Sequence, residues 1–174
     1  MQKFGGTSVG SGERLKLVAN IIHKTAIDSG VIVVVSALSP EQKANGTTSL
    51  LLKAAKNAVS GENYADILET IRNYHRATAV SAISAVDIRD SAFAFIDAEI
   101  ARIESVLKAF LILRESTPAS LDSVIAAGEK LSAKLLCLVL KDQGLSSSYE
   151  DLSEIVKLNG SDSDSELFDA TQAE

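Results

Sequence analysis

Five consecutive β-branched residues, Val31-Ile32-Val33-Val34-Val35, constrain the fold of this chain most strongly. A run of this kind, without polar alternation, is typical of a strand that is buried on both faces of a parallel sheet. The run follows Ser29-Gly30, which ends a segment whose apolar residues recur at helical spacing. A short segment, Met1 to Phe4, precedes that helix, and a glycine-rich loop, Gly5 to Gly12, separates the two. Residues 1–35 therefore predict a βαβ unit.

The crossover of a βαβ unit is right-handed, so both strands end at the same edge of the sheet, where open α/β folds bind ligands. Paired glycines between a strand and a helix let backbone N–H groups approach an anion, and the helix N-terminus adds partial positive charge. Lys3 would add a point charge for phosphate groups. The loop is not a Walker A motif, because no Lys follows Gly10-Ser11-Gly12, and it lacks the third glycine of a dinucleotide fingerprint.

The rest of the chain predicts mainly helices. Ser36 to Gly46 is a polar loop, after which Thr47 or Thr48 can cap a helix. The further elements that we expect are helical stripes over residues 64–78 and 96–110, a helix from Pro118 to Gly144 capped by Thr117 or Ser120, a strand around Ser147 to Tyr149, and a helix from Glu166.

Composition excludes several classes of protein. With 174 residues, of which 46% are hydrophobic, the chain can form a globular core. Its net charge of −6 gives no electrostatic support for binding nucleic acid or an anionic membrane. The single cysteine, Cys137, cannot form an internal disulfide, and with the isolated His23 and His75 it cannot build a zinc site. Because no apolar run is long enough to span a membrane and no signal pattern is present, we expect a cytoplasmic protein.

Three motifs follow one another along the chain. They are Lys3-Phe4-Gly5-Gly6-Thr7-Ser8-Val9, Ser36-Ala37 with Gly46-Thr47-Thr48-Ser49-Leu50-Leu51, and Gly128-Glu129-Lys130-Leu131-Ser132. They resemble, in the same order, the N-terminal signature, the second-strand loop and the Gly-Glu helix of aspartate kinases in the amino-acid kinase family. The resemblance covers nearly the whole chain, and Gln2 and Tyr149 to Ser153 are most similar to fungal members.

The resemblance implies an α/β fold with three layers and a mostly parallel central sheet, of which residues 1–174 would form the N-terminal, substrate-binding part. The nucleotide-side part of the catalytic domain and the paired regulatory ACT domains of these enzymes have no counterpart in this sequence. The chain alone is therefore expected to be inactive. The resemblance also implies a homo-oligomer for the full-length enzyme.

The implied reaction is ATP-dependent phosphorylation of the side-chain carboxylate of L-aspartate to 4-phospho-L-aspartate, the first step in the biosynthesis of threonine, methionine and isoleucine and, in some organisms, of lysine. The implied ligands of the ATP phosphates are Lys3, Gly5, Gly6 and Ser8, with Lys3 also the catalytic residue. Mg²⁺ would be held mainly by the ATP phosphates. The implied aspartate pocket contains Ser36, Thr48 and Glu129, and Thr47 is an alternative to Thr48.

These roles make chemical sense. The attacking carboxylate is already ionised at neutral pH, so the reaction needs alignment and charge neutralisation rather than a general base. Glu129 would pair with the substrate ammonium, and no cation lies three or four residues from it on its helix. Two alternatives stay open: another member of the family, acting on carbamate, glutamate, acetylglutamate or a nucleoside monophosphate, and a non-catalytic α/β module.

Overall fold

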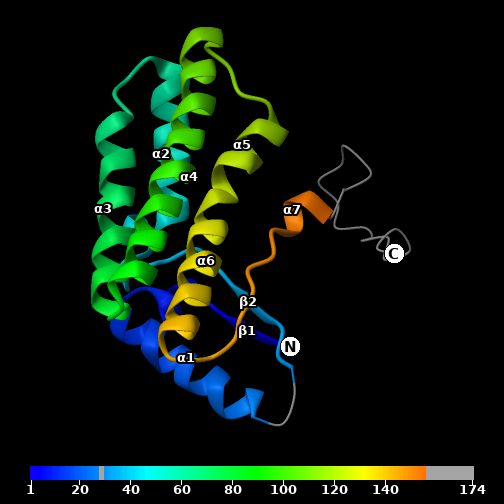
Figure 1. Cartoon of the computed structure of the whole chain (residues 1–174). Helices are drawn as coiled ribbons and strands as arrows, with labels where there is room; N and C mark the ends of the chain where they lie inside the picture. Colours follow the sequence, from blue (N-terminus) through cyan, green and yellow to red (C-terminus); the bar gives the residue numbers. More distant parts are fainter. Residues whose placement is uncertain (28–29, 156–174) are drawn as a thin grey trace.

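The structure, a computed structural model, describes residues 1–27 and 30–155 (Figure 1). A two-stranded sheet and its crossover helix α1 lie at one end of a group of long helices, α2 to α6 (Figure 1). The helix predicted from Glu166 lies outside the described residues.

The predicted βαβ unit is confirmed. Strands β1 (Gln2–Phe4) and β2 (Val33–Val35) pair in parallel, with Lys3 opposite Val34. The crossover helix α1 (Gly12–Ala26) begins after Ser11, whose side chain accepts a hydrogen bond from the backbone N–H of Arg14. A short 3₁₀ turn, η1 (Gly6–Val9), joins β1 to this helix. The glycine-rich loop therefore lies at the carboxyl end of β1, as the sequence indicates.

The prediction that Val31 to Val35 are buried on both faces is wrong for the described structure. Ile32 is 70% exposed and Val34 is 38% exposed, whereas Val35 is buried. The reason is that the sheet has two strands among the described residues, and only the face carrying Phe4, Val33 and Val35 packs against the apolar core. The opposite face, which carries Lys3 and Val34, is left open to solvent.

The predicted helical stripes are confirmed. Helices α2 (Thr47–Ser60), α3 (Ala65–Ala82) and α4 (Val86–Leu113) pack against one another (Figure 1), and η2 (Lys43–Asn45) precedes the first of them. The stripe residues Leu68, Ile71, Ile100, Ile103 and Leu107 are buried in the core that these helices share. Within the described part of the chain, no helix combines the length and the apolar character that crossing a membrane requires.

The helix predicted from Pro118 to Gly144 is divided in two. Helix α5 (Pro118–Ile125) begins at Thr117, which forms the predicted cap together with Ser120, and α6 (Ala127–Asp142) follows. The interruption is local, because the backbone of Ala126 keeps helical angles of φ −59° and ψ −20°. The first turn of α6 is then placed against the loop that follows β2, as described below.

The strand predicted around Ser147 to Tyr149 does not form among the described residues. This segment is held instead by contacts with the helices: Ser147 donates a hydrogen bond to the carbonyl oxygen of Cys137, and the Tyr149 ring meets Phe95 edge-on at 5.8 Å. A groove of about 650 Å³ separates it from β2. A last short helix, α7 (Leu152–Ile155), follows. The described residues thus form a mostly helical α/β fold with a small parallel sheet.

Candidate active site

The segment Ser36–Ser39, which follows β2, is where the three sequence motifs meet. At its start, the N–H of Ser36 donates to the carbonyl oxygen of Phe4 at 3.1 Å. At its end, the N–H of Ser39 donates to the carbonyl oxygen of Gly6, also at 3.1 Å. The loop after β2 therefore runs directly beside the glycine-rich loop, as the right-handed crossover predicts.

Two glycines permit this close approach. A Cβ added at Gly6 would lie 2.4 Å from the carbonyl oxygen of Ala37, and one at Gly10 would lie 2.0 Å from that of Ser39. Both distances are far below van der Waals contact, so neither position accepts a side chain without moving the backbone. Gly5 is different, because a Cβ there would meet nothing within 4 Å. Gly5 is exposed at the mouth of the loop, and its lack of a side chain leaves that space open.

The start of α2 lies on the other side of the same segment. The backbone N–H of Thr47 and its hydroxyl group both donate to the carbonyl oxygen of Leu38, at 3.0 and 2.9 Å. The cap of α2 is Gly46, so the prediction that Thr47 or Thr48 caps this helix is wrong. The Thr47 side chain turns back to the loop and is fully buried, whereas Thr48 is half-buried. Of the two threonines, Thr48 is the one whose hydroxyl group is not already used in this contact.

The Gly-Glu motif at the start of α6 completes the arrangement. A Cβ added at Gly128 would lie 2.8 Å from the Cβ of Ala37 and 3.3 Å from the Cγ2 of Thr47. Glu129 is the next residue and is exposed. Its neighbour Lys130 is bound elsewhere, with its ammonium group 2.7 Å from Asp151. Among the described residues no ion pair engages Glu129, so its carboxylate is available to a cationic ligand.

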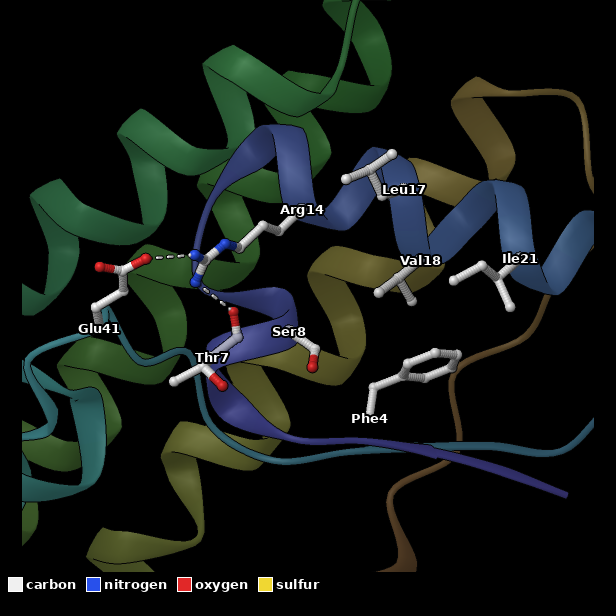
Figure 2. A pocket seen from close by; sticks show the side chains of 8 residues that line it. All are labelled: Phe4, Thr7, Ser8, Arg14, Leu17, Val18, Ile21 and Glu41. Atoms are coloured by element: carbon white, nitrogen blue, oxygen red, sulfur yellow. Dashed lines mark hydrogen bonds and ion pairs between the residues drawn. The ribbon is translucent and has the colours of Figure 1, made fainter.

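Lys3 and Ser8 lie on the glycine-loop side of this arrangement. Because side chains alternate along a strand, Lys3 lies on the open face of the sheet, opposite to the face on which Phe4 packs. Ser8 is exposed on η1 and lines a hollow of about 600 Å³ beside α1 (Figure 2). In the described structure no hydrogen bond or ion pair joins Lys3 to Glu129. The contacts bring together Gly6, the Ser36–Ser39 segment and the residues adjoining Thr48 and Glu129.

Two residues beside the glycine-rich loop were not anticipated from the sequence. Arg14 of α1 donates to the carbonyl oxygen of Thr7 at 2.8 Å and to Glu41 at 2.9 Å (Figure 2). Tyr74 of α3 donates its hydroxyl hydrogen to the carbonyl oxygen of Gly10 at 2.8 Å. In the sequence, Arg14 has the pattern of a helix-surface base and Tyr74 that of a core residue. No local signal indicates that either contacts the loop.

The electrostatics around the loop favour a neutral Tyr74. Burial raises the pKa of its hydroxyl group, and the nearby positive charge of Arg14 opposes this only in part. Tyr74 therefore remains a hydrogen-bond donor throughout the neutral pH range. No cluster of three or more His, Cys, Asp or Glu side chains that could hold a metal ion is found in the described ranges 1–27 and 30–155.

The comparisons with known proteins identify the family of this chain. The model of the amino acid kinase family matches residues 2–174, so the chain belongs to that family. It is 36% identical over 159 residues to the aspartokinase of Candida albicans, a match that covers 91% of this chain and 29% of the relative. It is 35% identical to the aspartokinase of Schizosaccharomyces pombe, covering 90% of this chain and 30% of that protein.

A solved structure shows the same fold. Aspartokinase III of Escherichia coli, in complex with aspartate and ADP, superposes with a TM-score of 0.71 at 25% sequence identity. The match covers 89% of this chain and 31% of that one. The chain therefore spans about a third or less of the length of each of these relatives.

Proposed function

We propose that this chain forms part of an aspartate kinase, which transfers the γ-phosphoryl group of ATP to the side-chain carboxylate of L-aspartate. The observation that carries the proposal is the convergence of three motifs on the Ser36–Ser39 segment, which is contacted by Gly6, Thr47 and Gly128. These contacts support an active site around this segment, at the edge of the sheet where open α/β folds bind ligands, with the glycine-rich loop on one side and the carboxylate of Glu129 on the other. The similarity to fungal aspartokinases supports the choice of substrate.

In this proposal the glycine-rich loop holds the ATP phosphates. Gly6 and Thr7 begin η1, and the first N–H groups of such a turn have no partner within it. These donors, the open space at Gly5 and the exposed hydroxyl group of Ser8 fit an anionic ligand. Lys3 is assigned to neutralise charge on the phosphoryl group as it moves. Mg²⁺ is assigned mainly to the ATP phosphates.

The other side of the segment is assigned to L-aspartate. Ser36 directly follows β2, and Thr48 has a hydroxyl group that is not engaged by Leu38, unlike that of Thr47. We assign Glu129 to the substrate ammonium group, because its carboxylate is exposed and carries no ion pair in the described structure. The reacting carboxylate of aspartate is ionised at neutral pH, so these side chains need only bind and align it.

Further parts of the proposal concern the complete enzyme. The open face of the sheet, with Ile32 and Val34 exposed, supports a three-layer domain in which further strands and helices cover these residues. Residues 1–174 would then be the substrate-binding part of that domain. We also propose a homo-oligomeric, cytoplasmic enzyme of threonine and methionine biosynthesis. These points rest on the family resemblance, and the location also on the single cysteine.

The test is an assay of ATP consumption by the full-length gene product, with L-aspartate, L-glutamate, N-acetylglutamate, carbamate and nucleoside monophosphates offered separately. We expect turnover that depends on L-aspartate and yields an acyl phosphate, which hydroxylamine traps as a hydroxamate. The Lys3→Met variant is expected to reduce turnover by about a hundredfold or more, the range found when one charge-stabilising donor is removed from a reaction. Turnover with another acceptor and none with aspartate would reject this function.

A further inference from the structure

Three carbonyl oxygens of the glycine-rich loop accept hydrogen bonds from outside the loop. Gly6 accepts from the N–H of Ser39 at 3.1 Å, Thr7 accepts from Arg14 at 2.8 Å, and Gly10 accepts from the Tyr74 hydroxyl group at 2.8 Å. The donors come from three different elements: the loop after β2, helix α1 and helix α3. The loop is therefore fixed at its start, middle and end.

Fixing a carbonyl also fixes the N–H group of the same peptide unit, because the peptide is planar and the two groups point in opposite directions. The Gly6 carbonyl belongs to the same peptide unit as the N–H of Thr7, so the bond from Ser39 orients that donor directly. The Thr7 carbonyl shares its unit with the N–H of Ser8, which donates to Gly5 at 2.9 Å within the turn, and the Gly10 carbonyl shares its unit with the N–H of Ser11 at the start of α1. Arg14 and Tyr74 therefore hold the turn that carries the phosphate-facing donors in place before any ligand arrives. Preorganised donors contribute most to a reaction in which charge moves.

We propose that Arg14 and Tyr74 are positioning residues of the phosphoryl-transfer site, which act by holding the glycine-rich loop in its phosphate-binding form. This inference rests on the proposed kinase function. It adds two residues that touch the backbone of the loop, and it assigns them no contact with either substrate.

Arg14 is suited to this role because its guanidinium group donates in two directions. One arm reaches the Thr7 carbonyl oxygen, and the other reaches Glu41, in the loop after β2 (Figure 2). The Glu41 side chain is 83% exposed, so this ion pair is weak. The bond to Thr7 is therefore the arm that positions the loop, and Glu41 adds only a weak contact to the other arm of the guanidinium group. An ammonium group in its place cannot reproduce the planar two-way geometry.

Tyr74 contacts the loop through a single hydrogen bond from its hydroxyl group, so this contact can be removed without changing any other. The ring is half-buried and packs against the core formed by α1, β2 and α6, which leaves the hydroxyl group little freedom to move. Its raised pKa keeps the proton on the oxygen at neutral pH, so the bond to Gly10 persists. Replacement by Phe removes this bond and keeps the packing of the ring.

Loss of Arg14 or Tyr74 should affect the proposed ATP side of the site and the proposed aspartate side differently. The Ser36–Ser39 segment is held to α2 by Thr47 and is packed against Gly128, contacts in which Arg14 and Tyr74 take no part. Loss of either positioning residue should therefore affect ATP more than aspartate. If a residue only stabilised the fold, its loss would lower the stability of the protein and would not change the KM for ATP more than the KM for aspartate.

The experiment compares Tyr74→Phe, Arg14→Gln, Arg14→Lys and the double variant Arg14→Gln/Tyr74→Phe in the full-length gene product. The matched controls are Tyr64→Phe, which changes a buried tyrosine of the core shared by α2, α3 and α4, and Arg89→Gln, on α4. Each single change at the loop is expected to raise the KM for ATP, and the Kd for ADP measured by calorimetry, by about fivefold, the effect of one lost hydrogen bond. The KM for aspartate should change less than twofold, and the double variant should exceed either single one. Arg14→Lys should resemble Arg14→Gln.

Equal changes in both KM values, or no change beyond that of the controls, would overturn the proposal. A fall in Tm that is larger than in the controls, with unchanged ADP affinity, would also overturn it and leave Arg14 and Tyr74 with a structural role only. If the unmodified protein shows no aspartate-dependent turnover but binds ADP, the proposed substrate fails. The positioning role is then still decided by the ADP affinities. If the unmodified protein binds no nucleotide, both proposals fail.

Discussion

Gly128 of α6 packs so closely on Ala37 that a Cβ added at Gly128 would lie 2.8 Å from the Cβ of Ala37. This contact joins the start of α6, which carries Glu129, to the segment that follows β2, where we propose that the substrate binds. It explains why the glycine of the Gly-Glu motif cannot be replaced without moving one element. The position of the Glu129 carboxylate, which we propose binds the substrate ammonium group, thus depends on a residue that has no side chain.

We expect Gly128→Ala to destabilise the chain by about 1–3 kcal/mol, the usual cost of overpacking a tight contact. The gain in helix propensity from replacing a glycine within α6 offsets at most about 1 kcal/mol of this. Urea denaturation followed by circular dichroism measures the change. Gly30→Ala is the matched control, since a Cβ there meets nothing within 4 Å. Equal stability of the two variants would show that α6 does not depend on this contact.

The parts of the site that could be predicted from the sequence are those that local patterns determine. The glycine-rich loop, the βαβ unit and the N-cap at Thr117 each depend on residues a few positions apart. The contact of Gly128 with Ala37 follows from the packing of α6 across the loop, and only the family resemblance indicated that the two motifs belong together.

Other features depend on distant partners and left no local signal. Tyr74 contacts Gly10, which lies 64 residues away in the sequence. The exposure of Ile32 and Val34 depends on which strands and helices cover the sheet, and a β-branched run does not specify these. The strand predicted around Ser147 to Tyr149 does not form, because the contacts of Ser147 with Cys137 and of Tyr149 with Phe95 hold the segment against the helices instead.

The proposed role of Glu129 predicts that its substitution changes the KM for aspartate and not the KM for ATP. In the full-length gene product, Glu129→Gln should raise the KM for aspartate by at least about tenfold, because the acceptor of the substrate ammonium group loses its negative charge. The KM for ATP should change less than twofold. Steady-state kinetics with each substrate varied in turn measures both values. Glu62→Gln, an exposed carboxylate after the end of α2, is the control. Equal increases for both substrates would contradict pairing with the substrate ammonium group.

The polypeptide of residues 1–174 is expected to show no aspartate-dependent consumption of ATP when it is assayed alone. The nucleotide-side segments that the family resemblance implies are not among these residues, and the described structure leaves the Lys3 face of the sheet open. A coupled assay of ADP release, with and without L-aspartate, tests this. The helical circular dichroism signal of the same sample shows that the polypeptide is folded. Turnover that depends on aspartate would refute the prediction.

The buried His75 should make the free energy of unfolding depend on pH. Its ring is fully buried in α3, where Nδ1 donates to the carbonyl oxygen of Ile71 at 2.8 Å and Nε2 has no partner in the described structure. Burial lowers the pKa from 6.5 to about 4, and the bond to Ile71 opposes this shift only in part. Because the unfolded chain takes up a proton more readily, the stabilisation from a neutral His75 is complete above pH 6.5. It is lost as the pH falls towards 4, by about 3 kcal/mol in all.

We therefore expect the free energy of unfolding to fall between pH 7 and pH 5, and His75→Leu to reduce that slope. The absolute stability of His75→Leu does not test this prediction, because the substitution also changes the packing of α3. Urea denaturation at several pH values measures the slope for each variant. His23→Gln is the control, since it removes the other histidine of the chain, which is exposed on α1. An equal slope in the unmodified chain and in His75→Leu would show that His75 does not control stability in this pH range.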